Sequence, residues 1–266
     1  MSDRYRLPAL YQDNEGGCMV IAHRGASAYY PENTMASFKG AVELGAEMIE
    51  LDVLLSRDGV PVVFHDAKLE GHSSGKGLLS RYTLRQLKKL DAGAWFDKGF
   101  AGVQIPTLEE VLAFAAGTIA LNIEIKTEAV RDQRSGGIVE KCLQLVKEYG
   151  MGRHVLFSSF DYRAVTHLKT LDPHMPVALL YNRAASKNRL PGELVKQYKA
   201  DACNMSYRQF NAKRRRDLNS RGIPHFIYTV DHPNRMRKLL DAGVTGIFTN
   251  KPDLLKVVIN QWKKQQ

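Results

Sequence analysis

The sequence predicts an α/β fold, a (β/α)8 TIM-type barrel with a small insertion after the second strand. Short apolar runs, which are typical of buried strands, alternate with stretches of helical periodicity from Met19 onward. Apart from one antiparallel return strand, we count eight parallel strands and eight crossovers. The length of 266 residues also fits one barrel of roughly 250 residues. We therefore expect a single domain over residues 1–266, with an inserted cap segment at about 67–102.

The first unit of the barrel begins with the apolar strand expected at 19–23. Asn33 or Thr34 can cap the helix that follows, and Gly45 is a typical residue to end it. The second barrel strand is then expected at 48–55, one crossover away from the first.

A tight-turn signal, Ser56-Arg57-Asp58-Gly59, separates the second strand from another apolar run. Four residues cannot form the crossover that parallel strands need, so this run must return as an antiparallel hairpin. If the turn has no bulge, a four-residue loop pairs Leu55 with Val60. In that register Glu50 lies opposite His65, and opposed residues share a face of the sheet.

The segment at 67–102 is rich in Gly, Ser, Lys and aromatic residues and has one helical stretch near 83–90. We expect it to cover the open end of the barrel, where it either contacts the leaving group of a substrate or only adds packing. Helical periodicity resumes with Thr107 as the cap and Glu110 at the capping-box position.

Strands and helices alternate through the rest of the chain. The strands are expected at 120–125, 155–159, 177–181, 202–205, 225–229 and 246–249. The helices are expected at 137–149, 162–170, 192–198, 211–219, 233–242 and from about 253.

Two of the expected strands carry carboxylates where a buried strand normally carries aliphatic residues. Glu50 and Asp52 are two residues apart and therefore share a face, where they repel each other unless a cation or protons neutralise them. Glu124 shares a face of the next barrel strand with Asn122 and Lys126. Oxygen ligands of this kind suit a hard divalent cation, Mg²⁺ or Ca²⁺.

The alternative to a metal site is a network of salt bridges from these carboxylates to Arg24 and Lys126. Both side chains can also bind the anionic oxygens of a phosphate, Arg24 as a fork of donors and Lys126 as a compact charge. Histidine titrates near neutral pH, so His23 and His65 can divide the roles of base and acid. The sequence does not say which histidine is the acid.

Composition adds weaker constraints. A net charge of +10 favours anionic partners. The one dense cluster of basic residues, at 213–216, is expected on a solvated helix face, and the sequence contains no nucleic-acid-binding motif. The 3 cysteines are too few and too scattered for a disulfide framework. The polar start at 1–8 contains no apolar run long enough for a signal, and no segment approaches the length of a membrane span. We therefore expect a cytoplasmic protein.

Ordered motifs along the chain resemble those of the glycerophosphodiester phosphodiesterase family, over about 19–252. The motifs are His23-Arg24-Gly25, Pro31-Glu32-Asn33-Thr34, Glu50-Leu51-Asp52, Asp58-Gly59, His65-Asp66, Ile105-Pro106-Thr107 and Asn122-Ile123-Glu124-Ile125-Lys126. The resemblance implies a TIM-type barrel, a divalent metal ion, and hydrolysis of glycerophosphodiesters to an alcohol and glycerol 3-phosphate. It also implies that His23 and His65 are the catalytic pair.

Phe160, Asn204 and Tyr228 end or follow barrel strands and are candidates for the wall of the glycerol pocket, core packing being the alternative.

The chain departs from the pattern of that family in two places. After His65-Asp66 members often have a Leu-x-Arg-Thr-x-Gly-like stretch, where this chain has Gly71-His72, and Asn250 stands where Asp is frequent. We expect neither departure to touch the catalytic set, although both lie on loops that shape substrate choice. Six other histidines stand outside the acidic cluster, have no carboxylate partners at ligand spacing and stay unassigned: His72, His154, His167, His174, His225 and His232.

Two other functions remain open. A lysophospholipase D or sphingomyelinase D-like enzyme would use the same barrel on a lipid, with apolar residues of the insertion at its open end. These are Leu78, Leu79, Trp95, Phe96 and Phe100. The third possibility is a non-catalytic binder of phosphodiesters, against which the acid–base pair argues. The sequence leaves the preferred alcohol, the identity of the ion and the oligomeric state undetermined.

Overall fold

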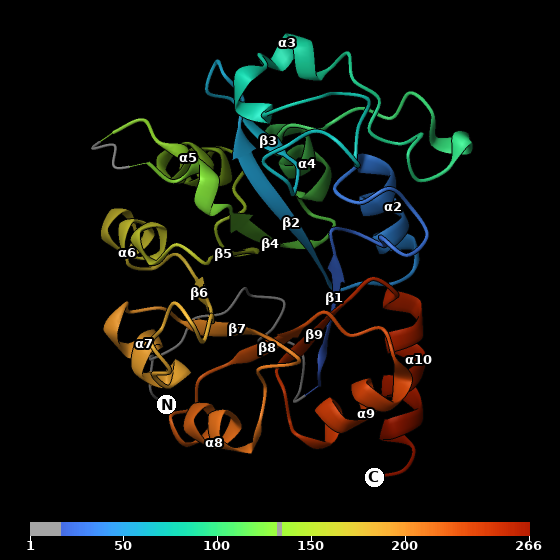
Figure 1. Cartoon of the computed structure of the whole chain (residues 1–266). Helices are drawn as coiled ribbons and strands as arrows, with labels where there is room; N and C mark the ends of the chain where they lie inside the picture. Colours follow the sequence, from blue (N-terminus) through green and yellow to red (C-terminus); the bar gives the residue numbers. More distant parts are fainter. Residues whose placement is uncertain (1–16, 132–134) are drawn as a thin grey trace.

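The computed structural model describes residues 17–131 and 135–266. Eight parallel strands form a closed barrel, because β1 pairs with β9 on one side and with β2 on the other (Figure 1). The strands are β1 (Met19–His23), β2 (Met48–Leu55), β4 (Ala120–Ile125), β5 (Val155–Ser159), β6 (Val177–Leu180), β7 (Ala202–Ser206), β8 (His225–Tyr228) and β9 (Gly246–Thr249). The predicted (β/α)8 barrel and its strands are therefore confirmed.

The eight crossover helices lie around the outside of this barrel (Figure 1). They are α2 (Met35–Glu43), α4 (Leu108–Ala115), α5 (Ile138–Glu148), α6 (Tyr162–Leu171), α7 (Pro191–Gln197), α8 (Ala212–Ser220), α9 (Pro233–Asp241) and α10 (Pro252–Lys263). Thr34, rather than Asn33, is the cap of α2, and Thr107 and Glu110 form the predicted capping box of α4. On α8, Lys213 and Arg216 are exposed as predicted, whereas Arg214 and Arg215 are half-buried, and Arg214 donates to the hydroxyl of Tyr181.

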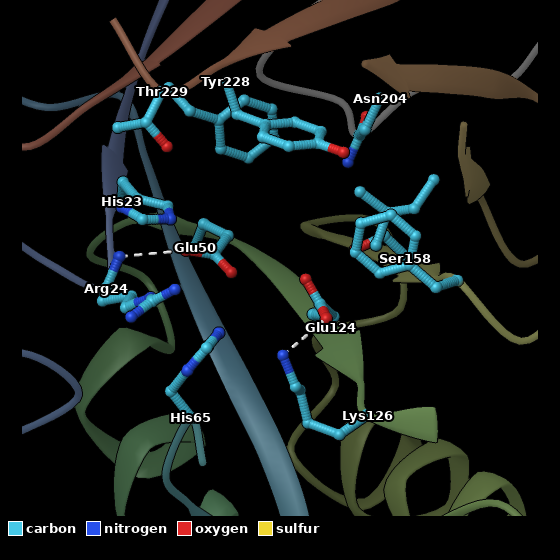
Figure 2. A pocket seen from close by; sticks show the side chains of 13 residues that line it. His23, Arg24, Glu50, His65, Glu124, Lys126, Ser158, Asn204, Tyr228 and Thr229 are labelled. Carbon is cyan, nitrogen blue, oxygen red and sulfur yellow. Dashed lines mark hydrogen bonds and ion pairs between the residues drawn. The ribbon is translucent and has the colours of Figure 1, made fainter. Parts of the chain in front are cut away.

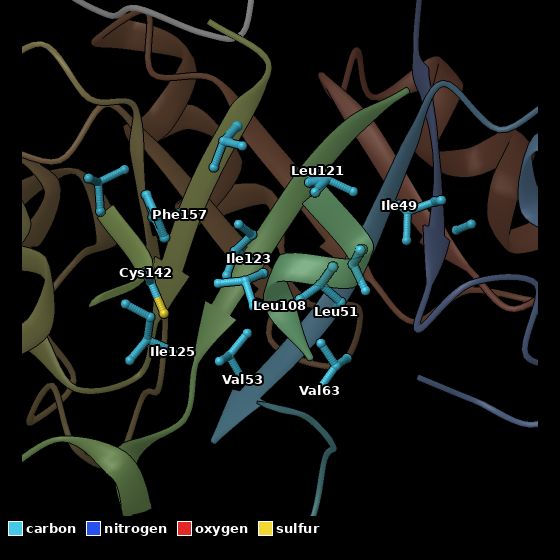
Figure 3. Packing of buried hydrophobic residues seen from close by; sticks show 14 of the residues in the cluster. Ile49, Leu51, Val53, Val63, Leu108, Leu121, Ile123, Ile125, Cys142 and Phe157 are labelled. Carbon is cyan, nitrogen blue, oxygen red and sulfur yellow. The ribbon is translucent and has the colours of Figure 1, made fainter. Parts of the chain in front are cut away.

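Apolar residues fill the barrel and the layer around it. The inner cluster lies toward the amino ends of the strands and consists of Met19, Ile21, Met48, Ala120, Leu156, Ala178, Ala202, Phe226 and Phe248. Small and large side chains alternate there, which lets them fill a narrow interior. The outer cluster packs the strands against the helices, for example Ile123 and Phe157 against Leu108 and Cys142 (Figure 3).

Two residues beyond the inner cluster, the inward-facing positions of several strands become polar. Because side chains alternate along a strand, these positions continue the same face. They are His23, Glu50, Asn122, Ser158, Asn204 and Tyr228. The barrel thus has an apolar floor and a polar layer above it, toward the carboxyl ends of the strands.

The antiparallel strand β3 (Pro61–Val63) confirms the hairpin, but the predicted register is wrong by one residue. Leu55 pairs with Pro61, not with Val60. Ser56 donates its N–H to the carbonyl of Val60 at 3.0 Å, so the loop consists of three residues, 57–59, rather than four. Gly59 ends this loop with a φ of 78°, which is typical of three-residue hairpins. The ladder ends at Val63, so His65 is not placed by a strand register at all.

The segment 67–102 lies between β3 and α4 and contains the helix α3 (Leu84–Leu87) and two 3₁₀ helices, at Leu79–Arg81 and Lys98–Phe100. Helix α3 is shorter than the predicted stretch at 83–90, because the backbone continues to residue 90 with i→i+3 hydrogen bonds. In Figure 1 it lies beyond the carboxyl end of β2, and the amide of Leu84 donates to Asp58 of the hairpin turn.

None of the helices in the described part of the chain has the length and apolar character that a membrane span requires. The polar start at 1–8, in which we expected no signal, lies outside the described residues.

Candidate active site

A cavity of about 210 Å³ opens in the polar layer of the barrel (Figure 2). Its walls come from barrel strands and from the loops that follow them. They are His23, Arg24, Glu50, His65, Glu124, Lys126, Ser158, Phe160, Leu180, Asn204, Tyr228, Thr229 and Phe248. Every residue that the sequence analysis places in the site lines this cavity except Asp52, which is buried behind Arg24 and Lys126.

The three predicted metal ligands form one carboxylate cluster. Asp52 and Glu124 are partners in the ladder between β2 and β4, and Glu50 precedes Asp52 by two residues on the same face. One oxygen of each carboxylate lies within 4.8 Å of the others. Burial and then the charges of Asp52 and Glu124 raise the pKa of Glu50 well above its ordinary value. Burial and then Asp52 raise the pKa of Glu124 to about 7.

Two cations share the same site. The Nζ atom of Lys126 lies 3.0 Å from Oε1 of Glu124 and 3.2 Å from Oδ1 of Asp52. Arg24 donates its backbone N–H to Glu50 at 2.9 Å, and its Nε lies 3.4 Å from Oδ2 of Asp52. Burial raises the pKa of Asp52, but the charges of Lys126 and Arg24 outweigh burial and lower it to about 2. The salt bridges that the sequence offered as an alternative to a metal site are therefore present.

These salt bridges do not balance the charge of the cluster. Glu32 also pairs with Arg24, at 2.9 Å between Oε1 and Nη1. When all four carboxylates are ionised they face two cations, and a divalent cation would cancel the remaining negative charge, which otherwise favours protons on Glu50 and Glu124. The donor set of the cluster, made only of carboxylate oxygens, fits Mg²⁺ or Ca²⁺.

Strained backbone shapes the turn after β1. Arg24 has a φ of 55° and Gly25 a φ of 82°. A side chain at Gly25 would bring its Cβ to 2.4 Å from Oγ of Ser37, so only glycine fits. Asn33, also at a φ of 55°, donates from Nδ2 to Asp52 at 2.9 Å and so helps to hold this carboxylate. Left-handed residues of this kind persist where the surrounding structure fixes them, commonly at functional sites.

His23 is held by the loop that follows β9. Its Nδ1 lies 2.8 Å from Oδ1 of Asn250, and Nδ2 of Asn250 donates to Oδ2 of Asp231 at 2.7 Å. Because this second bond fixes which end of the amide faces His23, Nδ1 must be the donor, and Nε2 keeps its lone pair. Burial and then the charge of Arg24 lower the pKa of His23 to about 4. The expectation that Asn250 would not touch the catalytic set is wrong.

His65 is held by the residue that follows it. Its Nδ1 lies 2.7 Å from Oδ1 of Asp66, and His72 lies 3.2 Å from the other oxygen of the same carboxylate. A carboxylate only accepts hydrogen bonds, so Nδ1 of His65 is the donor here as well. Two of the unassigned histidines therefore have carboxylate partners that spacing in the sequence did not reveal, since His167 also lies 3.5 Å from Glu140. Figure 2 shows the rings of His23 and His65 turned toward the carboxylate cluster.

Another wall of the cavity consists of aromatic and amide side chains. The ring of Tyr228 packs edge-on against Phe160 at 6.4 Å. Asn204 donates to Oδ1 of Asn122 at 3.0 Å, and Asn122 donates to Ser158 at 2.6 Å. Tyr228 and Asn204 both line this wall (Figure 2).

Sequence reasoning missed the residues that orient the site, namely Glu32, Asn33, Asp66, His72, Asp231 and Asn250. Five of them belong to motifs or departures that were visible in the sequence, but a motif does not say which side chain binds which partner. Asp231 had no signal, since it meets Asn250 only through the pairing of β8 with β9.

Comparisons with known proteins agree on one family. The model of the glycerophosphoryl diester phosphodiesterase family matches residues 23–254. A glycerophosphodiester phosphodiesterase of Caldanaerobacter subterraneus is 38% identical over 238 residues, which cover 89% of this chain and 96% of that protein. One of Bacillus subtilis is 35% identical over 256 residues, covering 90% of this chain and 86% of that protein.

Solved structures give the same answer. A phosphodiesterase of Oleispira antarctica, in complex with the product sn-glycerol-3-phosphate, superimposes with a TM-score of 0.83 at 28% identity, covering 94% of this chain and 99% of that one. A glycerophosphodiester phosphodiesterase of Agrobacterium tumefaciens gives a TM-score of 0.79 at 27% identity, covering 90% and 99%. This chain therefore belongs to the glycerophosphoryl diester phosphodiesterase family and is a phosphoric diester hydrolase.

Proposed function

We propose that this enzyme hydrolyses glycerophosphodiesters to an alcohol and sn-glycerol 3-phosphate, with a divalent cation and a pair of histidines. One observation carries the proposal. The carboxylate cluster lies in one cavity with His23 and His65, whose Nδ1 atoms are both engaged by oxygen acceptors. Both Nε2 atoms are then left for the substrate.

His23 is the proposed base. Its lowered pKa keeps the ring neutral at neutral pH, and the bond from Nδ1 to Asn250 leaves the lone pair on Nε2. A neutral imidazole with a free lone pair can take a proton from a nucleophile.

His65 is the proposed acid. The hydrogen bond from Nδ1 to Asp66 holds the ring in place, so that a proton on Nε2 can pass to the departing oxygen. The opposite assignment would need an imidazolium at His23, where burial and Arg24 both disfavour it.

The two histidines account for every proton in the reaction. His23 takes a proton from the nucleophile, whose oxygen forms a bond to phosphorus, while His65 protonates the alcohol oxygen as its bond to phosphorus breaks. If the nucleophile is water, the products form in one step. If it is the neighbouring glycerol hydroxyl, a cyclic phosphate forms first, and water then opens it with the two roles exchanged.

Glu50, Asp52 and Glu124 would hold the cation, either Mg²⁺ or Ca²⁺. When bound, the cation supplies positive charge that stabilises the anionic oxygens of the phosphate. Arg24 and Lys126 act beside it, and they orient the phosphate between the histidines.

Phe160, Asn204 and Tyr228 are proposed to hold the glycerol. The two rings cover its carbon atoms, and the amide and the phenol offer polar partners to its hydroxyl groups. Asn204 and Tyr228 lie across the cavity from Lys126 and His65 (Figure 2), so the phosphate is proposed to bind between the glycerol and these two residues.

A lipid phosphodiesterase is the second candidate. Leu78, Trp95 and Phe160 are exposed, which a long-chain substrate could use. Leu79 is buried, so it does not contribute to such a surface. Activity on a lysophospholipid that exceeds activity on glycerophosphocholine would favour this candidate.

The experiment that tests the proposal is a substrate panel with defined ions. Glycerophosphocholine, glycerophosphoethanolamine and a lysophospholipid are offered with Mg²⁺, Ca²⁺ or chelator, and sn-glycerol 3-phosphate is measured.

We also propose a reducing cytoplasmic location, which the free thiols of Cys18, Cys142 and Cys203 support.

A further inference from the structure

A histidine of the segment 67–102, His72, contacts the partners of two active-site residues. Its Nδ1 lies 3.2 Å from Oδ2 of Asp66, whose Oδ1 lies 2.7 Å from Nδ1 of His65. Its Nε2 lies 4.0 Å from Oε1 of Glu32, which lies 2.9 Å from Nη1 of Arg24. His72 therefore stands between the carboxylate that orients the histidine and the carboxylate that orients the arginine.

The ring of His72 is itself held in place by the same segment. It packs edge-on against Trp95, with 4.6 Å between ring centroids and an angle of 89°. Trp95 is anchored by its indole N–H, which donates to the carbonyl of Ala92 at 2.8 Å. Asp91 fixes the loop by accepting from Gly93 and Gly102, both at 2.7 Å. The place of His72 is thus set by the segment and not by the barrel.

The carboxylate that His72 contacts, Asp66, is partly exposed to water. The side chain of Asp66 is 42% exposed, so water competes for its oxygens. A hydrogen bond from His72 to Oδ2 leaves Oδ1 as the acceptor for His65, which keeps the ring from turning. The side chain of His72 is 31% exposed, so its removal leaves no buried cavity in the core.

We propose that His72 is a positioning residue, through which the inserted segment keeps Asp66 on His65 and so keeps the Nε2 proton of His65 aimed at the departing oxygen. This inference rests on the proposed role of His65 as the acid. It gives the segment a part in protonating the leaving group.

The test compares two diesters of glycerol that differ in the leaving group. The choline alkoxide of glycerophosphocholine needs a proton to depart, whereas the nitrophenolate of glycerol p-nitrophenyl phosphate does not. We expect His72→Ala to lower kcat for glycerophosphocholine by between about twofold and tenfold, the effect of losing one hydrogen bond, and to leave kcat for the nitrophenyl diester unchanged. His72→Asn, whose amide N–H can replace the Nδ1 donor, should restore most of the loss.

Three outcomes overturn the inference: equal losses on both diesters, no loss on glycerophosphocholine, or no rescue by His72→Asn. His174→Ala, at an exposed position away from the cavity, is the control and should change neither rate. Thermal unfolding of each variant checks that the fold is intact. His65→Ala separates this inference from the proposed function. If His65→Ala lowers kcat equally for both diesters, the assignment of His65 as the acid is wrong. If His65→Ala lowers kcat mainly for glycerophosphocholine but His72→Ala does not, only the role of His72 is contradicted.

Discussion

The Nδ1 atom of His23 lies 2.8 Å from Oδ1 of Asn250, and this contact between opposite ends of the chain fixes the tautomer of the ring. Asn250 is in turn held by Asp231, which accepts from its side-chain and backbone nitrogens at 2.7 and 2.8 Å. A neutral amide, unlike a carboxylate, does not stabilise the imidazolium by its charge. The proposed base is therefore kept uncharged by its surroundings.

Replacing this amide with a carboxylate should change the pH profile. In Asn250→Asp the new negative charge favours the protonated ring and raises the pKa of His23 from its lowered value of about 4. Since a base is inactive when protonated, the acidic limb of kcat/KM should move to higher pH. Asn234→Asp, at an exposed position of α9, adds the same charge elsewhere and should leave the limb in place. A limb that does not move, or that moves to lower pH, would exclude His23 as the base.

Removal of either histidine should abolish most of the activity. His23→Ala and His65→Ala are each expected to lower kcat for glycerophosphocholine by about 10²- to 10⁴-fold, the usual contribution of acid–base catalysis. Product formation is measured at saturating substrate, so that binding does not affect the comparison. Activity of both variants within about tenfold of the parent enzyme would contradict the assignment, because that is less than such catalysis usually supplies.

Metal binding should be visible without any assay of activity. Mg²⁺ or Ca²⁺ is expected to raise the unfolding temperature, because a ligand at 100 times its Kd stabilises the native state by about 2.7 kcal/mol. Glu50→Gln should reduce this rise in the unfolding temperature. In chelator, this variant should be no less stable than the parent enzyme, because the substitution removes repulsion from Asp52 and Glu124. Glu43→Gln on the exposed face of α2 is the matched control. A shift that survives in Glu50→Gln would place the ion elsewhere.

The proposed glycerol pocket should distinguish substrates by their hydroxyl groups. Asn204→Leu removes a polar group from the cavity wall and the hydrogen bond to Asn122. We expect kcat/KM for glycerophosphocholine to fall by about tenfold or more, and kcat/KM for ethyl p-nitrophenyl phosphate, which has no glycerol, to fall less. Equal losses for both substrates would mean that Asn204 acts on the fold of the site and not on glycerol.

The hairpin that precedes His65 should depend on Gly59. Its φ of 78° is costly for other residues, so Gly59→Ala should lower the free energy of unfolding by about 1 kcal/mol. The new Cβ would lie 2.7 Å from Nζ of Lys141, but that flexible end can move aside. Gly152→Ala is the control, because its Cβ would meet only Met175, at 3.7 Å. Urea unfolding of the two variants measures the difference, and an equal effect would contradict the turn described here.

Much of the fold could be predicted because the barrel follows from alternation along the chain. The run from Met48 to Leu55 revealed a buried strand, and its carboxylates revealed which face was unusual. The register of the hairpin could not be predicted in the same way, since it depends on whether Gly59 belongs to a three- or four-residue loop. A change of one residue in that loop reverses every side chain of the return strand.

The side chains facing the cavity could also be predicted, but the residues that hold them could not. His23 and Glu50 are marked by their place on strands, whereas Asn250 and His72 reach the site from loops. Which loop residue meets which histidine depends on backbone paths that periodicity does not describe. The wrong expectation about Asn250 came from treating a loop departure as remote from the chemistry.

Metal-dependent hydrolysis by this enzyme is tested most directly with glycerophosphocholine after removal of divalent ions. Enzyme freed of metal with chelator is titrated with Mg²⁺ or Ca²⁺, and sn-glycerol 3-phosphate and choline are followed by phosphorus and proton NMR. We expect no turnover without the ion and full turnover, with equal amounts of both products, once it is restored. Turnover that is indifferent to chelator, or release of phosphocholine in place of choline, would contradict the central claim.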